Sequence, residues 1–214
     1  YREGAMMLPS EIHKIKGIVI TLSGPSGVGK GTVISRITEM CPMIRHSISV
    51  TTRPPRLGEA DGIQYYFTDR KSFEDMIAAG EILEYDDYCG NYYGTPKKPL
   101  IEAIERGEDT ILDITVPGSL SVMESFPDAV SIFLLPPSFS ELKRRLESRG
   151  TESREIMQKR LEKAYNEIEM TKMFDYVLVN DDLDVTAGRI LSIAEAEKHR
   201  YKRLEGIEEA LLKH

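Results

Sequence analysis

A glycine-rich segment at residues 24–32, GPSGVGKGT, carries the clearest chemistry in the sequence and nearly matches the Walker A pattern. Glycines let such a loop curl so that backbone N–H groups point at phosphate oxygens, and the following helix adds its positive end. Lys30 is placed to bridge the β- and γ-phosphates of a nucleoside triphosphate and to act in catalysis. The predicted ATP contacts in the loop are Gly24, Pro25, Ser26, Gly27, Val28, Gly29, Lys30, Gly31 and Thr32. A glycine turn with an incidental lysine is the alternative, but the flanking strand and helix favour the phosphate site.

The residues that would handle magnesium depart slightly from that pattern. Gly31 occupies the position where Ser or Thr is usual, and the hydroxyl group comes one residue later at Thr32. This shift favours a hold on Mg²⁺ through water over a direct bond. Asp113, at the end of an apolar strand, is placed like a Walker B acid that orients the waters on Mg²⁺. A capping or solvent-exposed role is the alternative for this carboxylate.

Two arginines on a loop with two prolines suggest a second phosphate site. Arg53 and Arg56 are three residues apart, so their guanidinium groups can fork one phosphate at low entropy cost. A tyrosine hydroxyl nearby supplies a further donor. The alternative is that the arginines are solvated and that the tyrosines of this region are core aromatics.

Short apolar runs predict the elements that position these groups. A strand at residues 16–23 precedes the glycine loop, and a helix at 29–40 follows it. Further strands are predicted at 109–115, 129–135 and 176–179, each separated by helical segments. This order predicts a three-layer α/β/α P-loop NTPase fold with a parallel core sheet that is covered on both faces.

Two segments differ from this core in their composition and predicted secondary structure. An inserted α/β lobe, rich in tyrosines and turns, contains one helix near residues 71–79. A helical, strongly charged segment follows later, and Ser138 with Glu141 forms a predicted capping box at its start. A C-terminal helix from Val185 is expected to break near Arg200. The predicted boundaries are core 14–45, 98–136 and 173–214, acceptor lobe 46–97, and lid 137–172.

The composition excludes several classes of function. The chain has 214 residues and a net charge of −7, which argues against a broad electrostatic grip on nucleic acid or on an anionic membrane. Two distant cysteines and four scattered histidines offer no metal-ligand spacing. No apolar run approaches the roughly 18 residues of a membrane span. We therefore expect a cytoplasmic protein without a structural metal, either a monomer or a homodimer.

Three strings in the acceptor lobe carry a family resemblance. They are TTRPPRLGE at 51–59, GIQYYF at 62–67 and GNYYGT at 90–95. With the glycine loop and the later segments, they resemble the guanylate kinase family, which transfers phosphate from ATP to GMP, in the family's order from about Gly17 to Leu183. The resemblance implies an acceptor lobe that binds GMP and uses dGMP as well.

The resemblance also implies the parts of the GMP site. Arg53, Arg56, Tyr65 and Tyr93 would hold the phosphate. Glu84 would accept hydrogens from guanine N1 and the exocyclic amine, while the hydroxyls of Ser49 and Thr95 would donate to O6. Adenine offers an acceptor at N1, so a carboxylate there would cost on the order of 1–3 kcal/mol. The alternative for Glu84 alone is a surface strand end.

The helical segment resembles the family's lid. Arg145, Arg149 and Arg160 are the implied catalytic cations, brought to the transferring phosphate when both substrates are bound. Closure of this kind suppresses hydrolysis of ATP. A salt-bridged surface helix is the alternative and suits the other basic residues of the segment. Asn180 resembles the loop that borders the ATP adenine.

Three positions depart from the family pattern. Thr115 stands where the family has an aspartate that contacts the acceptor, Pro117 replaces a glutamine, and Gln64 replaces a frequent aspartate. Two other functions therefore stay open: a paralogue that phosphorylates another nucleoside monophosphate, and a non-catalytic module that binds phosphopeptides. Such modules usually have a degraded phosphate loop, whereas this chain keeps Lys30.

Overall fold

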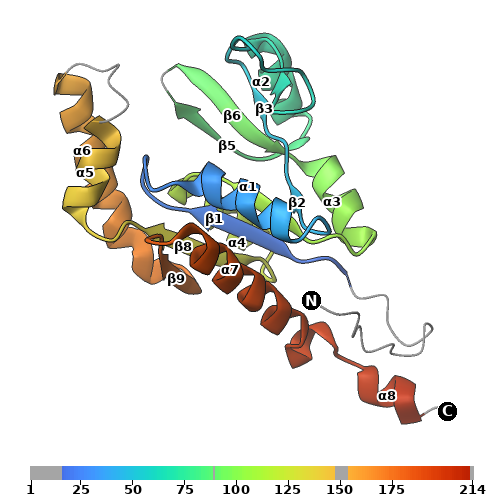
Figure 1. Ribbon diagram of the computed structural model, residues 1–214. Coiled ribbons are helices and arrows are strands. Elements are labelled where there is room, and N and C mark those ends of the chain that lie inside the picture. Colours follow the sequence, from blue (N-terminus) through green and yellow to red (C-terminus); the bar gives the residue numbers. More distant parts are fainter. Residues whose placement is uncertain (1–15, 89, 148–153, 213–214) are drawn as a thin grey trace.

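The core of the molecule is a parallel sheet. The computed structural model describes residues 16–88, 90–147 and 154–212 (Figure 1). In this part of the chain, five parallel strands are ordered β2-β7-β1-β8-β9. The strands are β1 Val19–Ser23, β2 Arg45–His46, β7 Thr110–Asp113, β8 Val130–Leu135 and β9 Tyr176–Val179. The parallel core sheet predicted from the apolar runs is confirmed.

Helices cover both faces of this sheet. On one face, Val33 and Ile37 of α1 and Ile190 of α7 pack in one buried cluster with Ile20 and Leu22 of β1. On the other, a second cluster joins residues of α3 and α4 to β1 and β7. The bounds of these helices are α1 Lys30–Met40, α3 Lys97–Glu105, α4 Val116–Ser125 and α7 Leu183–Lys198. All five residues of β1 are buried, and Val19 packs on the opposite face from Ile20 and Leu22, as expected for a strand covered on both faces.

The acceptor lobe rises above the sheet as a smaller sheet with one helix (Figure 1). Its strands are ordered β4-β3-β6-β5, and β5 and β6 are antiparallel. Phe73 of the helix is fully buried and stacks on Tyr92 at 5.2 Å between ring centroids. The elements are β3 Val50–Thr51, β4 Tyr66–Phe67, α2 Arg70–Ala78, β5 Ile82–Tyr88 and β6 Asn91–Pro96. The predicted helix near 71–79 is therefore present as α2.

The predicted lid forms two helices beside the core, α5 Phe139–Glu147 and α6 Arg154–Glu169. Leu142 and Leu146 of α5 pack against Leu161 and Ala164 of α6. Ser138 Oγ accepts a hydrogen bond from the backbone N–H of Glu141 at 3.1 Å. The side chain of Glu141 instead accepts bonds from Arg144 and Arg145. Only half of the predicted capping box is therefore seen.

The later part of the chain follows the prediction closely. A 3₁₀ turn at Met170–Met173 leads to β9, and α7 ends before His199. A short turn at Tyr201–Arg203 precedes α8, Ile207–Leu212. The expected break near Arg200 is confirmed. No helix in the described ranges is long and apolar enough to cross a membrane.

One strand of the core was not predicted. β2 has two exposed residues, Arg45 and His46, and pairs with Thr110 and Ile111 of β7. A two-residue exposed strand has no hydrophobic periodicity, so the sequence carries no signal for it. The predicted start of the acceptor lobe at residue 46 falls inside this strand, and the lobe and lid boundaries stay a prediction.

Candidate active site

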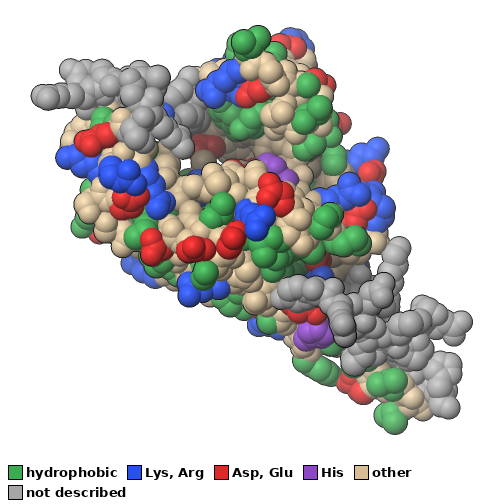
Figure 2. Space-filling model, in the orientation of Figure 1, with side chains coloured by type: hydrophobic (Ala, Val, Ile, Leu, Met, Phe, Trp, Pro, Cys, Tyr) green, Lys and Arg blue, Asp and Glu red, His purple; other side chains and the backbone are tan. Residues whose placement is uncertain are grey.

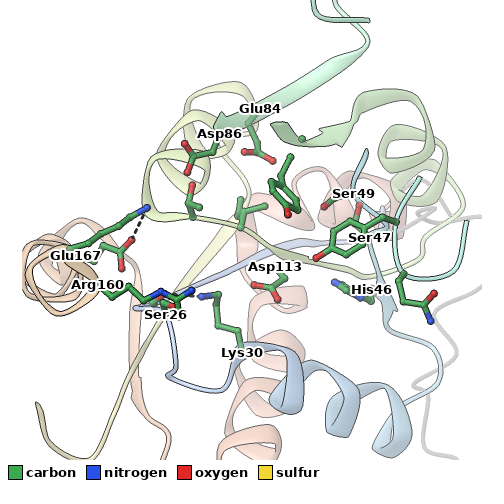
Figure 3. A pocket seen from close by; sticks show the side chains of 18 residues that line it. Ser26, Lys30, His46, Ser47, Ser49, Glu84, Asp86, Asp113, Arg160 and Glu167 are labelled. Carbon is green, nitrogen blue, oxygen red and sulfur yellow. Dashed lines mark hydrogen bonds and ion pairs between the residues drawn. The ribbon is translucent and has the colours of Figure 1, made fainter. Parts of the chain in front are cut away.

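One cavity of about 270 Å³ joins the three parts of the molecule. Its lining includes Lys30 from the glycine loop, Glu84 from the acceptor lobe and Arg160 from α6 (Figure 3). Asp113, at the end of β7, lies between the loop and the lobe. The space-filling view shows the hollow between the lobe and the core (Figure 2). Part of the set predicted for the donor and acceptor sites, including Lys30, Glu84 and Arg160, therefore meets in one cavity.

The glycine loop is closed on itself. Lys30 Nζ donates to the carbonyl of Gly24 at 2.8 Å, and the N–H of Val28 donates to the carbonyl of Pro25 at 3.1 Å. Gly29 precedes the first turn of α1 with φ 101°, a left-handed conformation that strains any residue with a Cβ. A Cβ there would also stand 2.8 Å from Asn180 Nδ2. Glycine at this position therefore allows both the left-handed backbone and the close approach of Asn180.

Asn180 and Arg145 hold the loop from its other side. The Asn180 amide donates to the carbonyl of Val28 at 2.8 Å, and Arg145 Nη1 donates to the same carbonyl at 3.3 Å. A second cavity lies here, and Thr32 contributes to its lining. Asn180 was predicted to border adenine, which stays a prediction; the structure gives it a direct contact with the phosphate loop.

Glu84 is the buried carboxylate of the acceptor wall, with 7% of its surface exposed. Thr95 Oγ1 donates to Glu84 Oε1 at 2.6 Å. Burial raises the pKa of Glu84, while the bond from Thr95 acts in the opposite direction. Since a hydroxyl has one proton, Thr95 in this arrangement serves Glu84 and leaves the proposed bond to guanine O6 to Ser49. Ser49 lines the cavity.

The arginines of the acceptor lobe are held differently from the predicted fork. Arg53 makes two bonds of 2.9 Å to the carboxylate of Glu59, and its guanidinium lies 5.4 Å from the ring centre of Tyr65. The bond from Arg53 is the main cause that lowers the pKa of Glu59. Arg56 is exposed, and its backbone N–H donates to Glu59. Neither arginine lines the cavity, whereas Tyr65 and Tyr93 do.

The lid contributes a stripe of charged residues to the cavity. Arg160, Lys163 and Glu167 of α6 all line it, at a spacing that places them on one helix face. Lys163 Nζ lies 3.9 Å from Glu167 Oε1, and burial raises the pKa of Glu167. Arg145 belongs to α5 of the lid, and its guanidinium contacts the glycine loop at the carbonyl of Val28. The predicted residue Arg149 lies outside the described residues.

Several lining residues were missed by the sequence reasoning. Lys163 and Glu167 share the helical spacing of Arg160, and Asp86 follows Glu84 by the two-residue period of a strand, so a signal existed for all three. His46 also lines the cavity, from the unpredicted strand β2. Partial burial lowers the pKa of His46, and nearby Asp113 acts in the opposite direction.

The departures from the family pattern at the start of α4 have a local explanation. Thr115 Oγ1 accepts a bond from the N–H of Gly118 at 3.3 Å, which caps the helix as an aspartate would. Pro117 lies in the first turn of α4, where a backbone N–H has no helical partner to lose. Both substitutions therefore preserve the helix that supports the acceptor wall.

Among the described residues, no group of three or more His, Cys, Asp or Glu side chains forms a metal site. Asp113 and Thr32, the residues predicted to handle Mg²⁺, line different cavities. Mg²⁺ keeps several waters and takes phosphate oxygens as ligands, so one carboxylate and one hydroxyl acting through water fit this ion.

A parallel sheet with a phosphate loop between its first strand and first helix defines the class of P-loop nucleotide-binding proteins. The sequence matches the family described as guanylate kinase over residues 16–197. It is 48% identical over 187 residues to the guanylate kinase of Desulfitobacterium hafniense, covering 87% of this chain and 94% of the relative. It is 50% identical to that of Thermus thermophilus over 198 residues, with 92% and 90% covered.

A solved structure agrees with these sequence relatives. The crystal structure of guanylate kinase from Anaplasma phagocytophilum superposes with a TM-score of 0.79 at 37% identity, covering 95% of this chain and 97% of that one. The chain belongs to the guanylate kinase family.

Proposed function

We propose that the protein transfers the γ-phosphate of ATP to GMP, giving ADP and GDP. The observation that carries this proposal is the single cavity in which Lys30 of the glycine loop lies below the buried carboxylate of Glu84. In the reaction, a phosphate oxygen of GMP forms a bond to the γ-phosphorus, and the bond from that phosphorus to the oxygen bridging to the β-phosphate breaks. The released electron pair stays on the β-phosphate of ADP.

The donor side binds ATP through the loop. Backbone N–H groups of the loop and the N-terminus of α1 point at the β- and γ-phosphates, and Lys30 exchanges the carbonyl of Gly24 for phosphate oxygens. Asn180 and Arg145 hold the carbonyl of Val28 during this exchange. Asp113 and Thr32 would hold Mg²⁺ through water, and the ion would supply positive charge to the phosphates.

The acceptor side selects guanine. Ionised Glu84 accepts hydrogens from N1 and from the exocyclic amine, and Thr95 fixes the orientation of the carboxylate. Ser49 donates to O6. Adenine would place an acceptor against this carboxylate, which is a repulsion in a buried site. Tyr65 and Tyr93 hold the GMP phosphate from the cavity wall.

The arginines complete the alignment of the two phosphates. Arg53 and Arg56 approach the GMP phosphate next to Tyr65, which requires Arg53 to share its guanidinium between Glu59 and the ligand. Arg160 of α6 supplies positive charge to the transferring group from above the loop. Charge placed in this way stabilises the transition state and keeps water out once the lid has closed.

Release of ADP, measured with GMP, dGMP, AMP, UMP and CMP in turn, tests the proposal. We expect turnover with GMP, lower or equal turnover with dGMP, and none above background with the other three. Turnover mainly with another monophosphate would identify a paralogous kinase. Failure to bind ATP would identify a non-catalytic module.

A further inference from the structure

Asp86 is a second carboxylate on the acceptor wall that the proposed reaction does not yet use. It follows Glu84 by two residues on β5, just after the irregularity in the β5–β6 register between Ile82 and Tyr85. Both line the cavity, and Figure 3 shows the two carboxylates on the same wall. Asp86 is half-buried, and no side chain in the described ranges donates a hydrogen bond to it.

The guanine edge has one more donor than Glu84 can satisfy. N1 carries one hydrogen and the exocyclic amine carries two, and a carboxylate facing this edge receives one hydrogen from each nitrogen. The second amine hydrogen points away from Glu84. A donor left without a partner in an enclosed site weakens binding, so the pocket needs a further acceptor beside Glu84.

The spacing on β5 suits an acceptor at that place. Residues two apart on a strand are separated by about 6.8 Å. The two hydrogens of the amine diverge by about 120°, so two acceptor oxygens about 2.9 Å from its nitrogen are about 5 Å apart, a distance that carboxylates on neighbouring same-side residues of a strand can span. Thr115 also lines the cavity, but its hydroxyl oxygen already accepts the N–H of Gly118 and is neutral. A charged acceptor makes the stronger bond, which favours Asp86.

The two carboxylates also affect each other. The charge of Asp86 is one of the causes that raise the pKa of Glu84, after the larger effect of burial. An amine that donates to both carboxylates relieves this repulsion. A ligand with the amine therefore binds more tightly at this wall than a ligand without it.

We propose that Asp86 accepts the second hydrogen of the exocyclic amine of the guanine base and is a specificity residue for 2-amino purines. This inference rests on the function proposed above. It predicts that the protein distinguishes GMP from IMP, which lacks the amine, through Asp86 as well as through Glu84.

The test compares kcat/KM for GMP, IMP and dGMP in the full chain and in Asp86→Ala. We expect kcat/KM for GMP to fall by about 10- to 100-fold while that for IMP stays within about twofold. The values for dGMP should fall as much as those for GMP. The control is a matched pair, Asp86→Asn and Asp87→Asn, in which each change removes one charge from β5.

Asp87 is exposed, and its Oδ1 accepts the N–H of Gly90, a bond that asparagine retains. Asp87→Asn should therefore leave all three substrates unchanged. An equal fall in kcat/KM for GMP and IMP would overturn the role of Asp86. Loss of a structural contact or of a contact with the lid would affect both substrates equally. A loss for GMP and IMP but not dGMP would also overturn it, since the carboxylate would then bind the ribose hydroxyl. Absence of GMP turnover in the parent would contradict the proposed function itself.

Discussion

The donor and acceptor sides of the cavity are prepared in different ways. On the donor side, Asn180 and Arg145 hold a backbone carbonyl of the loop, a group that a phosphate does not compete for. On the acceptor side, the groups that would bind the ligand are paired with each other: Arg53 with Glu59, and Glu84 with Thr95. We infer that ATP meets a loop whose backbone is already held and needs Lys30 alone to leave the carbonyl of Gly24, whereas GMP has to share side chains that are already engaged.

The largest effect is expected at the loop itself. Lys30→Ala removes the cation that follows the charge between the phosphates, and we expect kcat to fall by about 1,000-fold. Within the described part of the chain, the side chain of Lys30 makes one hydrogen bond, to Gly24, so the thermal unfolding midpoint should stay within about 2 °C. Steady-state ADP release and a melting curve check both. A fall of less than tenfold in kcat would contradict a role for Lys30 in phosphoryl transfer.

A glycine beside the acceptor carboxylate provides a sharper test of that side. A Cβ at Gly118 would stand 2.4 Å from Glu84 Oε2, so Gly118→Ala should push the carboxylate away from the base edge. We expect kcat/KM for GMP to fall by about tenfold or more, with ATP binding unchanged. Stability should change by less than about 1 kcal/mol, because alanine favours the helix.

Gly188→Ala is the matched control for that change. Gly188 also lies within a helix, α7, and a Cβ there would meet no atom within 4 Å. Its kinetics should match those of the parent. Equal kinetics in the two variants would show that the placement of Glu84 tolerates displacement, which contradicts a rigid guanine-reading wall.

The preformed state of the donor loop is tested at Asn180. Asn180→Ala removes the 2.8 Å bond to the buried carbonyl of Val28. We expect the dissociation constant for ATP to rise about tenfold, since ordering the loop then opposes binding, while that for GMP stays unchanged. Isothermal titration with each nucleotide separately measures both. A comparable loss for GMP would mean that the two sides are not prepared independently.

The smallest effect concerns the dependence of stability on pH. Burial raises the folded-state pKa of Glu84 above its ordinary value of about 4.5, so the ionised carboxylate destabilises the free protein at neutral pH. The cost is absent below pH 4.5 and grows as the pH rises toward the folded-state pKa. Glu84→Gln should therefore raise the melting midpoint at pH 7 by about 3–5 °C per pKa unit of elevation, and the gain should vanish in acid.

The sequence predicted the elements whose signals are local. The glycine loop, the buried strands and the helices α1 and α2 follow from apolar periodicity and glycine placement, and the structure contains them. The acceptor strings were recognised because their order and spacing are specific. Glu84, Tyr65 and Tyr93 consequently fell in the cavity where they were expected.

What the sequence did not predict depends on contacts between distant residues. The bond from Asn180 to Val28 joins residues 152 positions apart, and periodicity carries no information about it. Arg53 and Glu59 are only six residues apart. The sequence does not show their pairing, because a phosphate ligand and an internal carboxylate attract the same guanidinium. Strand β2 was not predicted because it is defined by its pairing with β7, which is distant in the sequence.

The most direct measurement is the binding of GMP and of an unhydrolysable ATP analogue, each alone, to the parent and to Glu84→Gln. An amide presents its own donor to guanine and lacks the charge, so the variant should bind GMP about 100-fold more weakly. Its affinity for the ATP analogue should remain within twofold. A parallel loss for both nucleotides, or undiminished binding of GMP, would contradict a cavity in which a buried carboxylate reads guanine opposite the phosphate loop.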